Sequence, residues 1–118
     1  MGKYKVVFHI NESNKCSTLL ANVNNLIKDL GKDNVIVEVV ANGAAVSDYV
    51  SDSNKDDNNL INKVSEAINF GIKFMACKNS LVGNKIDERL IPEFITVIPA
   101  GVTELVKKQA AGYGYIKP

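Results

Sequence analysis

Residues Val35–Ala41 read VIVEVVA, an almost continuous apolar stretch that Asn42-Gly43 brings to an end. A strand without an exposed polar face is typical of a parallel sheet that helices cover on both sides. Glu38 is the exception, and we expect it toward an edge of the sheet or at an interface. The Asn-Gly pair favours a turn directly after the strand.

Other apolar runs alternate with helical patterns on both sides of this stretch. Strands are predicted at Tyr4–Ile10, 72–76, 94–98 and 113–116. Apolar residues spaced three or four apart predict helices within 19–30, 60–68 and 102–106, the first two closed by Gly31 and Gly71. A short helix is expected near 84–89, and residues 47–59 are expected to form a loop with a short helix around 46–50.

This alternation predicts one α/β domain over residues 1–118, with right-handed crossover connections. The residues expected in its core occupy strand interiors or the apolar stripes of helices. They are Val7, Leu26, Val37, Val39, Ile68, Phe74 and Ile98.

Composition narrows the classes of function. The net charge is +1 and the basic residues are scattered, so no nucleic-acid or membrane-surface patch is predicted. The apolar run at 6–10 is too short for a signal-peptide core, and no run is long enough to cross a bilayer. We expect a cytoplasmic protein in which Cys16 and Cys77 are both reduced.

Cys77 is the candidate reactive residue. The strand predicted at 72–76 delivers it to a carboxyl end, and Lys78, Asn79 and Ser80 follow as residues that begin a helix. Helix N–H groups and a neighbouring lysine both favour a thiolate. The competing interpretation is that Cys77 is a small buried apolar residue, the commoner role of a free cysteine.

Ligands of parallel α/β sheets bind beyond the carboxyl ends of the strands. In this chain the predicted ends carry His9, Asn11, Asn42, Gly43, Cys77, Pro99 and Gly101, which should therefore share a rim. His9, the only histidine, is either a packed residue with hydrogen bonds or a base, and the first is commoner.

The sequence lacks the residue patterns of metal, dinucleotide and phosphate sites. Cys16 is interpreted as structural, and one histidine with two distant cysteines gives no metal-site spacing. No cofactor is expected, because neither a dinucleotide fingerprint nor a phosphate-binding loop is present. Tyr113 and Tyr115 alternate with glycines, which fits an edge strand or an oligomer contact.

Taken together, these segments resemble the DsrE/DsrF-like family of small sulfur-relay proteins over nearly all 118 residues. The most specific matches are FMACKNSL at 74–81, similar to the family's aromatic-x-Ala-Cys-x-Asn-Thr/Ser-Leu, and VIPAGV at 97–102. LANVNNL at 20–26 and QAAGY at 109–113 support them. Many relatives carry histidine before the glycine that ends the second strand, where this chain has Asn42, so that only His9 could supply an imidazole.

The resemblance implies a three-layer α/β/α fold with a five-stranded, mostly parallel sheet, and a homo-oligomer, either a trimer or a hexamer. It also implies that Cys77 accepts sulfur as a persulfide from a donor protein and passes it to an acceptor protein. Lys78, Asn79, Ser80, His9, Asn42 and Gly43 would support that thiol. The alternative is a non-catalytic oligomeric binding module, with a small ligand or partner held at the strand ends.

Overall fold

The structure is a computed structural model that describes residues 4–50 and 58–118. Five strands form one sheet in which every neighbouring pair is parallel, in the order β4-β3-β2-β1-β5. The strands are β1 (Tyr4–Ile10), β2 (Val35–Ala41), β3 (Lys73–Cys77), β4 (Thr96–Ile98) and β5 (Gly114–Ile116). The predicted parallel α/β sheet is confirmed.

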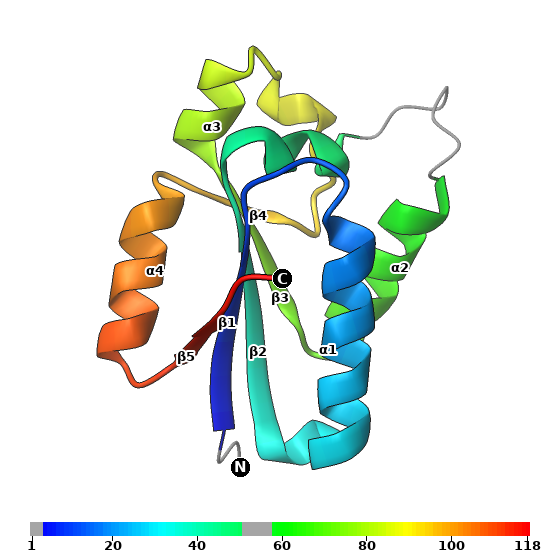
Figure 1. Ribbon diagram of the computed structural model, residues 1–118. Helices are drawn as coiled ribbons and strands as arrows, with labels where there is room; N and C mark the ends of the chain where they lie inside the picture. The colour runs from blue at the N-terminus through cyan, green and yellow to red at the C-terminus, as the bar shows by residue number, and fades with distance from the viewer. Residues whose placement is uncertain (1–3, 51–57) are drawn as a thin grey trace.

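Helices cover both faces of the sheet, which gives the three-layer α/β/α architecture (Figure 1). On one face lie α1 (Cys16–Leu30) and α2 (Asn58–Asn69), and on the other lies α4 (Gly101–Ala110). The short helix α3 (Lys78–Gly83) and the 3-10 segment η2 (Gly43–Tyr49) lie beyond the carboxyl ends of the strands. Two further 3-10 turns are η1 (Lys32–Asn34) and η3 (Glu88–Leu90).

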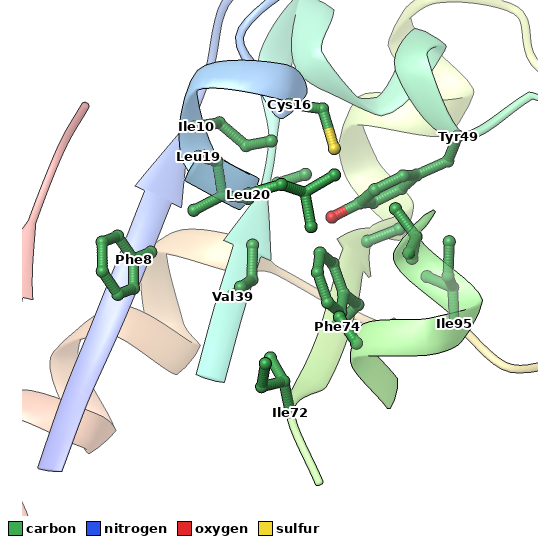
Figure 2. Close-up of a cluster of buried hydrophobic side chains, with 14 of the residues drawn as sticks. Phe8, Ile10, Cys16, Leu19, Leu20, Val39, Tyr49, Ile72, Phe74 and Ile95 are labelled. Atoms are coloured by element: carbon green, nitrogen blue, oxygen red, sulfur yellow. The ribbon is translucent and has the colours of Figure 1, made fainter. Parts of the chain in front are cut away.

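Alternation along the strands divides the apolar residues into a larger and a smaller core. Phe8, Val39 and Phe74 face α1 and α2, where Figure 2 shows them packed with Leu19, Leu20, Ile72 and Ile95. Their neighbours Val7, Val40 and Met75 face α4 and pack against Leu105. Of the predicted core residues, Val7, Val37, Val39 and Phe74 are buried, whereas Leu26, Ile68 and Ile98 are partly buried against a core cluster.

Three predictions about secondary structure need correction or restriction. Residues 84–89 do not form the expected helix, because α3 ends at Gly83, the chain turns at Lys85 with a positive φ of 58°, and only the 3-10 turn η3 follows at Glu88–Leu90. The fourth strand begins at Thr96 rather than at residue 94, because the turn that starts at Pro92 is closed by Ile95 N–H. In the expected loop, residues 43–49 form η2, and residues 51–57 lie outside the described residues.

The prediction that Glu38 lies toward an edge of the sheet was wrong. β2 is the central strand, and Glu38 is 8% exposed. Its carboxylate is buried beneath α4, where Lys108 supplies the opposite charge. The sequence pattern missed this because the compensating lysine lies 70 residues further along the chain.

Candidate functional site

The carboxyl ends of β1, β2 and β3 bring three polar residues to the face of the sheet that α4 covers. Val7, Val40 and Met75 face α4, so alternation directs His9, Asn42 and Cys77 to the same face two residues later. The N-terminus of α4 closes over them at Gly101. The predicted shared rim is therefore present.

Cys77 is the last residue of β3 and stands directly before α3. Burial raises the pKa of its thiol, but hydrogen bonds from the Ser80 hydroxyl and from the N–H groups of Gly101, Ser80 and Asn79 lower it. The donors outweigh burial, so the pKa of Cys77 lies below the ordinary thiol value. Thiolate is the nucleophilic form of cysteine, and this environment favours it.

Two helix N-termini thus meet at one sulfur. Asn79 and Ser80 belong to α3, whereas Gly101 begins α4. The two starts are also joined directly, because Asn79 N–H lies 3.4 Å from the carbonyl oxygen of Pro99, just before α4. N–H groups at a helix start carry partial positive charge, which stabilises an anion.

Gly101 allows this convergence because it has no side chain. A Cβ at position 101 would lie 3.3 Å from the Cβ of Cys77 and 3.2 Å from both the Cβ of Asn42 and a methyl carbon of Val40. The absence of that atom lets the backbone of α4 approach the thiol. It also shows that Asn42 and Cys77 are neighbours across Gly101.

Ser80 connects the thiol to the start of η2. Its hydroxyl donates toward Cys77 and accepts a 2.7 Å hydrogen bond from Gly43 N–H. Asn84 Nδ2 then donates to the carbonyl oxygens of Gly43, at 3.1 Å, and of Ser80, at 2.7 Å. Gly43 has φ of 57°, and a Cβ there would lie 2.9 Å from the Asn11 carbonyl oxygen, so glycine is required.

Lys78 and Asn79 differ in what they contribute. The Lys78 ammonium lies 3.4 Å from the Glu88 carboxylate, and both side chains are more than half exposed. The pKa of Cys77 is lowered by hydrogen-bond donors rather than by this ammonium. Asn79 is an exposed residue that acts through its backbone N–H.

His9 lies in a row of hydrogen bonds at the same rim. Its Nδ1 is 2.6 Å from the Tyr115 hydroxyl, and its Nε2 is 2.8 Å from Asn42 Oδ1. His9 is 9% exposed, and the Tyr115 ring lies tilted beside it, with ring centroids 5.7 Å apart. His9 is therefore held on both nitrogens, as the packed interpretation predicted.

Cys16 is far from a reactive state. It is fully buried in the larger core, and Figure 2 shows its sulfur directed toward Tyr49. Burial, together with the negative charge of Asp48, raises the pKa of Cys16 to about 12. The structural interpretation of Cys16 agrees with this environment.

The described residues contain neither a metal-ligand cluster nor a membrane-spanning helix. Across residues 4–50 and 58–118, no three His, Cys, Asp or Glu residues are grouped as a metal site would require. No helix in the same residues is long and apolar enough to cross a membrane.

Comparison with known proteins identifies the family. The DsrE/DsrF-like family matches residues 5–118. The chain belongs to this family. The resemblance that the sequence motifs predicted is thereby confirmed.

Solved structures of similar proteins share the fold of this chain. A protein of unknown function from Methanobacterium thermoautotrophicum, MTH1491, is 36% identical, with a TM-score of 0.84 over 98% of this chain and 99% of that one. The YchN protein of E. coli is 13% identical with a TM-score of 0.75 and full coverage of both chains. BT1422 of Bacteroides thetaiotaomicron, also of unknown function, is 16% identical with a TM-score of 0.73, covering 97% and 94%. No curated protein matches the chain.

For two residues of this DsrE/DsrF-like site, the sequence predicted the position but not the contacts. Gly101 was placed on the rim, but its hydrogen bond to Cys77 was not predicted. Tyr115 was expected in an edge strand, which β5 is, yet its hydroxyl also reaches His9. The sequence signal for Tyr115 was its alternation with Tyr113, since residues two positions apart along a strand lie on the same face.

Proposed function

We propose that this protein is a sulfur carrier that holds sulfane sulfur as a persulfide on Cys77 and passes it to a partner protein. The observation that carries the proposal is the arrangement of four hydrogen-bond donors around a thiol whose pKa they lower. Both cysteines are buried, but Cys77 keeps 5% exposure whereas Cys16 has none, so Cys77 is the less enclosed of the two thiols. Membership of a family associated with sulfur relay supports the same conclusion.

The loading step needs only the thiolate and a persulfide donor. The Cys77 thiolate attacks the outer sulfur of R–S–SH, a new S–S bond forms, and the S–S bond of the donor breaks. The products are Cys77–S–SH and the donor thiolate R–S⁻, so atoms and electrons balance without an external oxidant. Delivery is the same exchange in reverse, with a thiolate of the acceptor protein attacking the outer sulfur.

The donors around Cys77 suit both states of this cycle. They stabilise the attacking thiolate before loading and the persulfide anion afterwards, because N–H and O–H groups favour negative sulfur. Delivery itself restores the thiolate, but the free thiol must be kept from forming disulfides between cycles. The reducing cytoplasm meets that requirement, and we propose it as the location.

Mass spectrometry of the intact protein tests the proposal. After incubation with a persulfide donor, wild-type and Cys16→Ser proteins should each gain ~32 Da, one sulfur atom. The Cys77→Ser protein should gain nothing at that site. If folded wild-type protein neither takes up sulfur nor alkylates rapidly at Cys77, the binding-module alternative replaces the carrier.

We also propose that the protein is a homo-oligomer. α4 exposes Val102 and Val106 one turn apart, at 63% and 62%, and the edge strand β5 exposes Tyr115 and Ile116 at 42% each. Exposed apolar residues grouped in this way are typical of protein interfaces. Light scattering at micromolar concentration should give a trimer or hexamer mass, and Val106→Glu should reduce it while Lys107→Glu should not. A monomer mass for the wild-type protein would contradict the proposal.

A further inference from the structure

A row of hydrogen bonds connects the edge strand β5 to the neighbourhood of Cys77. The Tyr115 hydroxyl is 2.6 Å from His9 Nδ1, and His9 Nε2 is 2.8 Å from Asn42 Oδ1. The three residues come from β5, β1 and the turn after β2, and the two strands β5 and β1 are adjacent in the sheet. Asn42 is the end of the row that lies near the thiol.

The chemistry of the amide sets the direction of these bonds. Oδ1 of asparagine only accepts, so Nε2 of His9 must donate its hydrogen to it. Nδ1 then carries no hydrogen in the neutral imidazole and accepts from the Tyr115 hydroxyl. This direction leaves both hydrogens of Asn42 Nδ2 available. Within residues 4–50 and 58–118, Nδ2 has no acceptor.

The side chain of Asn42 also begins close to that of Cys77. The Cβ atoms of Asn42 and Cys77 lie 3.2 and 3.3 Å from one point, the Cβ position at residue 101. A persulfide adds an outer sulfur about 2 Å beyond Sγ, which lengthens the reach from the Cys77 side. The side chains of Asn42 and Cys77 thus begin at neighbouring positions, which places the Asn42 amide within reach of an anionic sulfur on Cys77.

We propose that Asn42 donates a hydrogen bond to the anionic sulfur at Cys77, and that His9 and Tyr115 are positioning residues that hold the Asn42 amide in the required orientation. This inference rests on the proposed carrier function and assigns an additional donor to the same site. In the opposite amide orientation, Oδ1 would face a negative sulfur and repel it. The charge at Cys77 therefore favours the direction described above, in which His9 carries its hydrogen on Nε2.

The tautomer of His9 provides a spectroscopic test that does not depend on sulfur transfer. His9 is the only histidine in the sequence, so untagged ¹⁵N-labelled protein gives the ring signals of one imidazole. The Nε2–H tautomer is expected in the reduced protein. Tyr115→Phe should shift the Nδ1 resonance, whereas Tyr113→Phe, the same change two residues away, should leave it unaltered because the Tyr113 hydroxyl bonds to Glu38. A dominant Nδ1–H tautomer would overturn the assigned direction.

Kinetics with inorganic polysulfide as the sulfur source test the contact itself. Asn42→Asp keeps an oxygen for His9 Nε2–H but removes the donor and adds a negative charge, so uptake at Cys77 should slow more than tenfold. Asn42→Ala should slow it about tenfold and Tyr115→Phe a few-fold, while Tyr113→Phe should stay within twofold of wild type. Circular dichroism on each variant establishes that it is folded.

The outcomes separate this inference from the proposed function. If wild-type protein takes up sulfur and Asn42→Asp does so equally fast, the Asn42 contact is refuted and the carrier function stands. If wild-type protein takes up no sulfur, the carrier function fails. In that case, alkylation rates against pH still test the contact, because Asn42→Ala removes the donor without adding charge and should raise the pKa of Cys77. An unchanged pKa in that variant would refute the contact.

Discussion

The Lys108 ammonium lies 3.0 Å from the Glu38 carboxylate, between α4 and the central strand of the sheet. The Tyr113 hydroxyl donates to the same carboxylate at 3.2 Å, and the Glu104 carboxylate lies 3.5 Å from the Lys108 ammonium. Burial lowers the pKa of Lys108, but the bond to Glu38 outweighs it and the pKa is raised. The pair therefore attaches α4 to the sheet as ions.

Replacing Glu38 should reduce stability without changing the thiol. Glu38→Gln keeps the shape but leaves the Lys108 ammonium without its main opposite charge, so the free energy of unfolding should fall by about 2 kcal/mol. Urea unfolding measures this, with the exposed Glu93→Gln as a control expected to stay within ~0.5 kcal/mol. Equal losses in both variants would show that the ion pair adds no stability.

Adding one carbon at Gly101 should weaken both packing and thiolate formation. Gly101→Ala places its Cβ 3.2–3.3 Å from Asn42, Val40 and Cys77. α4 must then move away, at a cost of about 1–3 kcal/mol, and its N–H moves with it, which raises the pKa of Cys77. Gly83→Ala is the matched control, because nothing lies within 4 Å of its new Cβ. Thermal unfolding and the pH dependence of alkylation should both distinguish the two variants.

Removing the Ser80 hydroxyl should slow the chemistry at neutral pH. Ser80→Ala deletes one donor to Cys77, so the pKa of the thiol rises and less thiolate is present at pH 7. Iodoacetamide should then modify Cys77 about tenfold more slowly. Ser17→Ala, at an exposed position of α1, should react like wild type. An unchanged rate in Ser80→Ala would mean that the backbone donors alone set the thiolate population.

Cys16 should make the fold sensitive to alkali. Folding raises the pKa of the Cys16 thiol from 9.0 to about 12, so the thiol ionises in the unfolded chain before it does in the folded protein. The free energy of unfolding is therefore unaffected below pH 9 and falls as the pH rises toward 12. The loss amounts to at most about 4 kcal/mol, at 1.36 kcal/mol per pKa unit. In Cys16→Ala the free energy of unfolding should fall less steeply with pH over that range. Denaturant titrations repeated from pH 8 upward measure this dependence. If the free energy of unfolding falls equally with pH in both proteins, ionisation of Cys16 is not the cause of the loss.

Sequence patterns predicted the sheet well because its signal is local. A strand such as Val35–Ala41 and a glycine that ends a helix can each be recognised from residues adjacent in the sequence. The position of Cys77 at a strand end followed from the same patterns. The start of α3 was half predicted, since Lys78 to Ser80 were expected to begin a helix, yet a separate one was also expected near 84–89.

Contacts between distant segments were not predictable in this way. Glu38 and Lys108 are 70 positions apart, and His9 and Tyr115 are 106 apart. Neither pairing leaves a periodic trace, because each depends on the order of the strands and on which helix covers which face. The contribution of Gly101 to the thiol was hidden for the same reason, since the residue meets Cys77 only after β3 and β4 have paired.

Three of the four groups that lower the pKa of Cys77 are main-chain N–H groups, at Asn79, Ser80 and Gly101. Most substitutions in the neighbourhood leave such groups in place, because every residue except proline keeps its N–H. The side chains at 78 and 79 can therefore be exchanged while the main-chain donors to the Cys77 thiol are kept. The environment of the thiol thus depends more on the path of the main chain than on which side chains occupy these two positions.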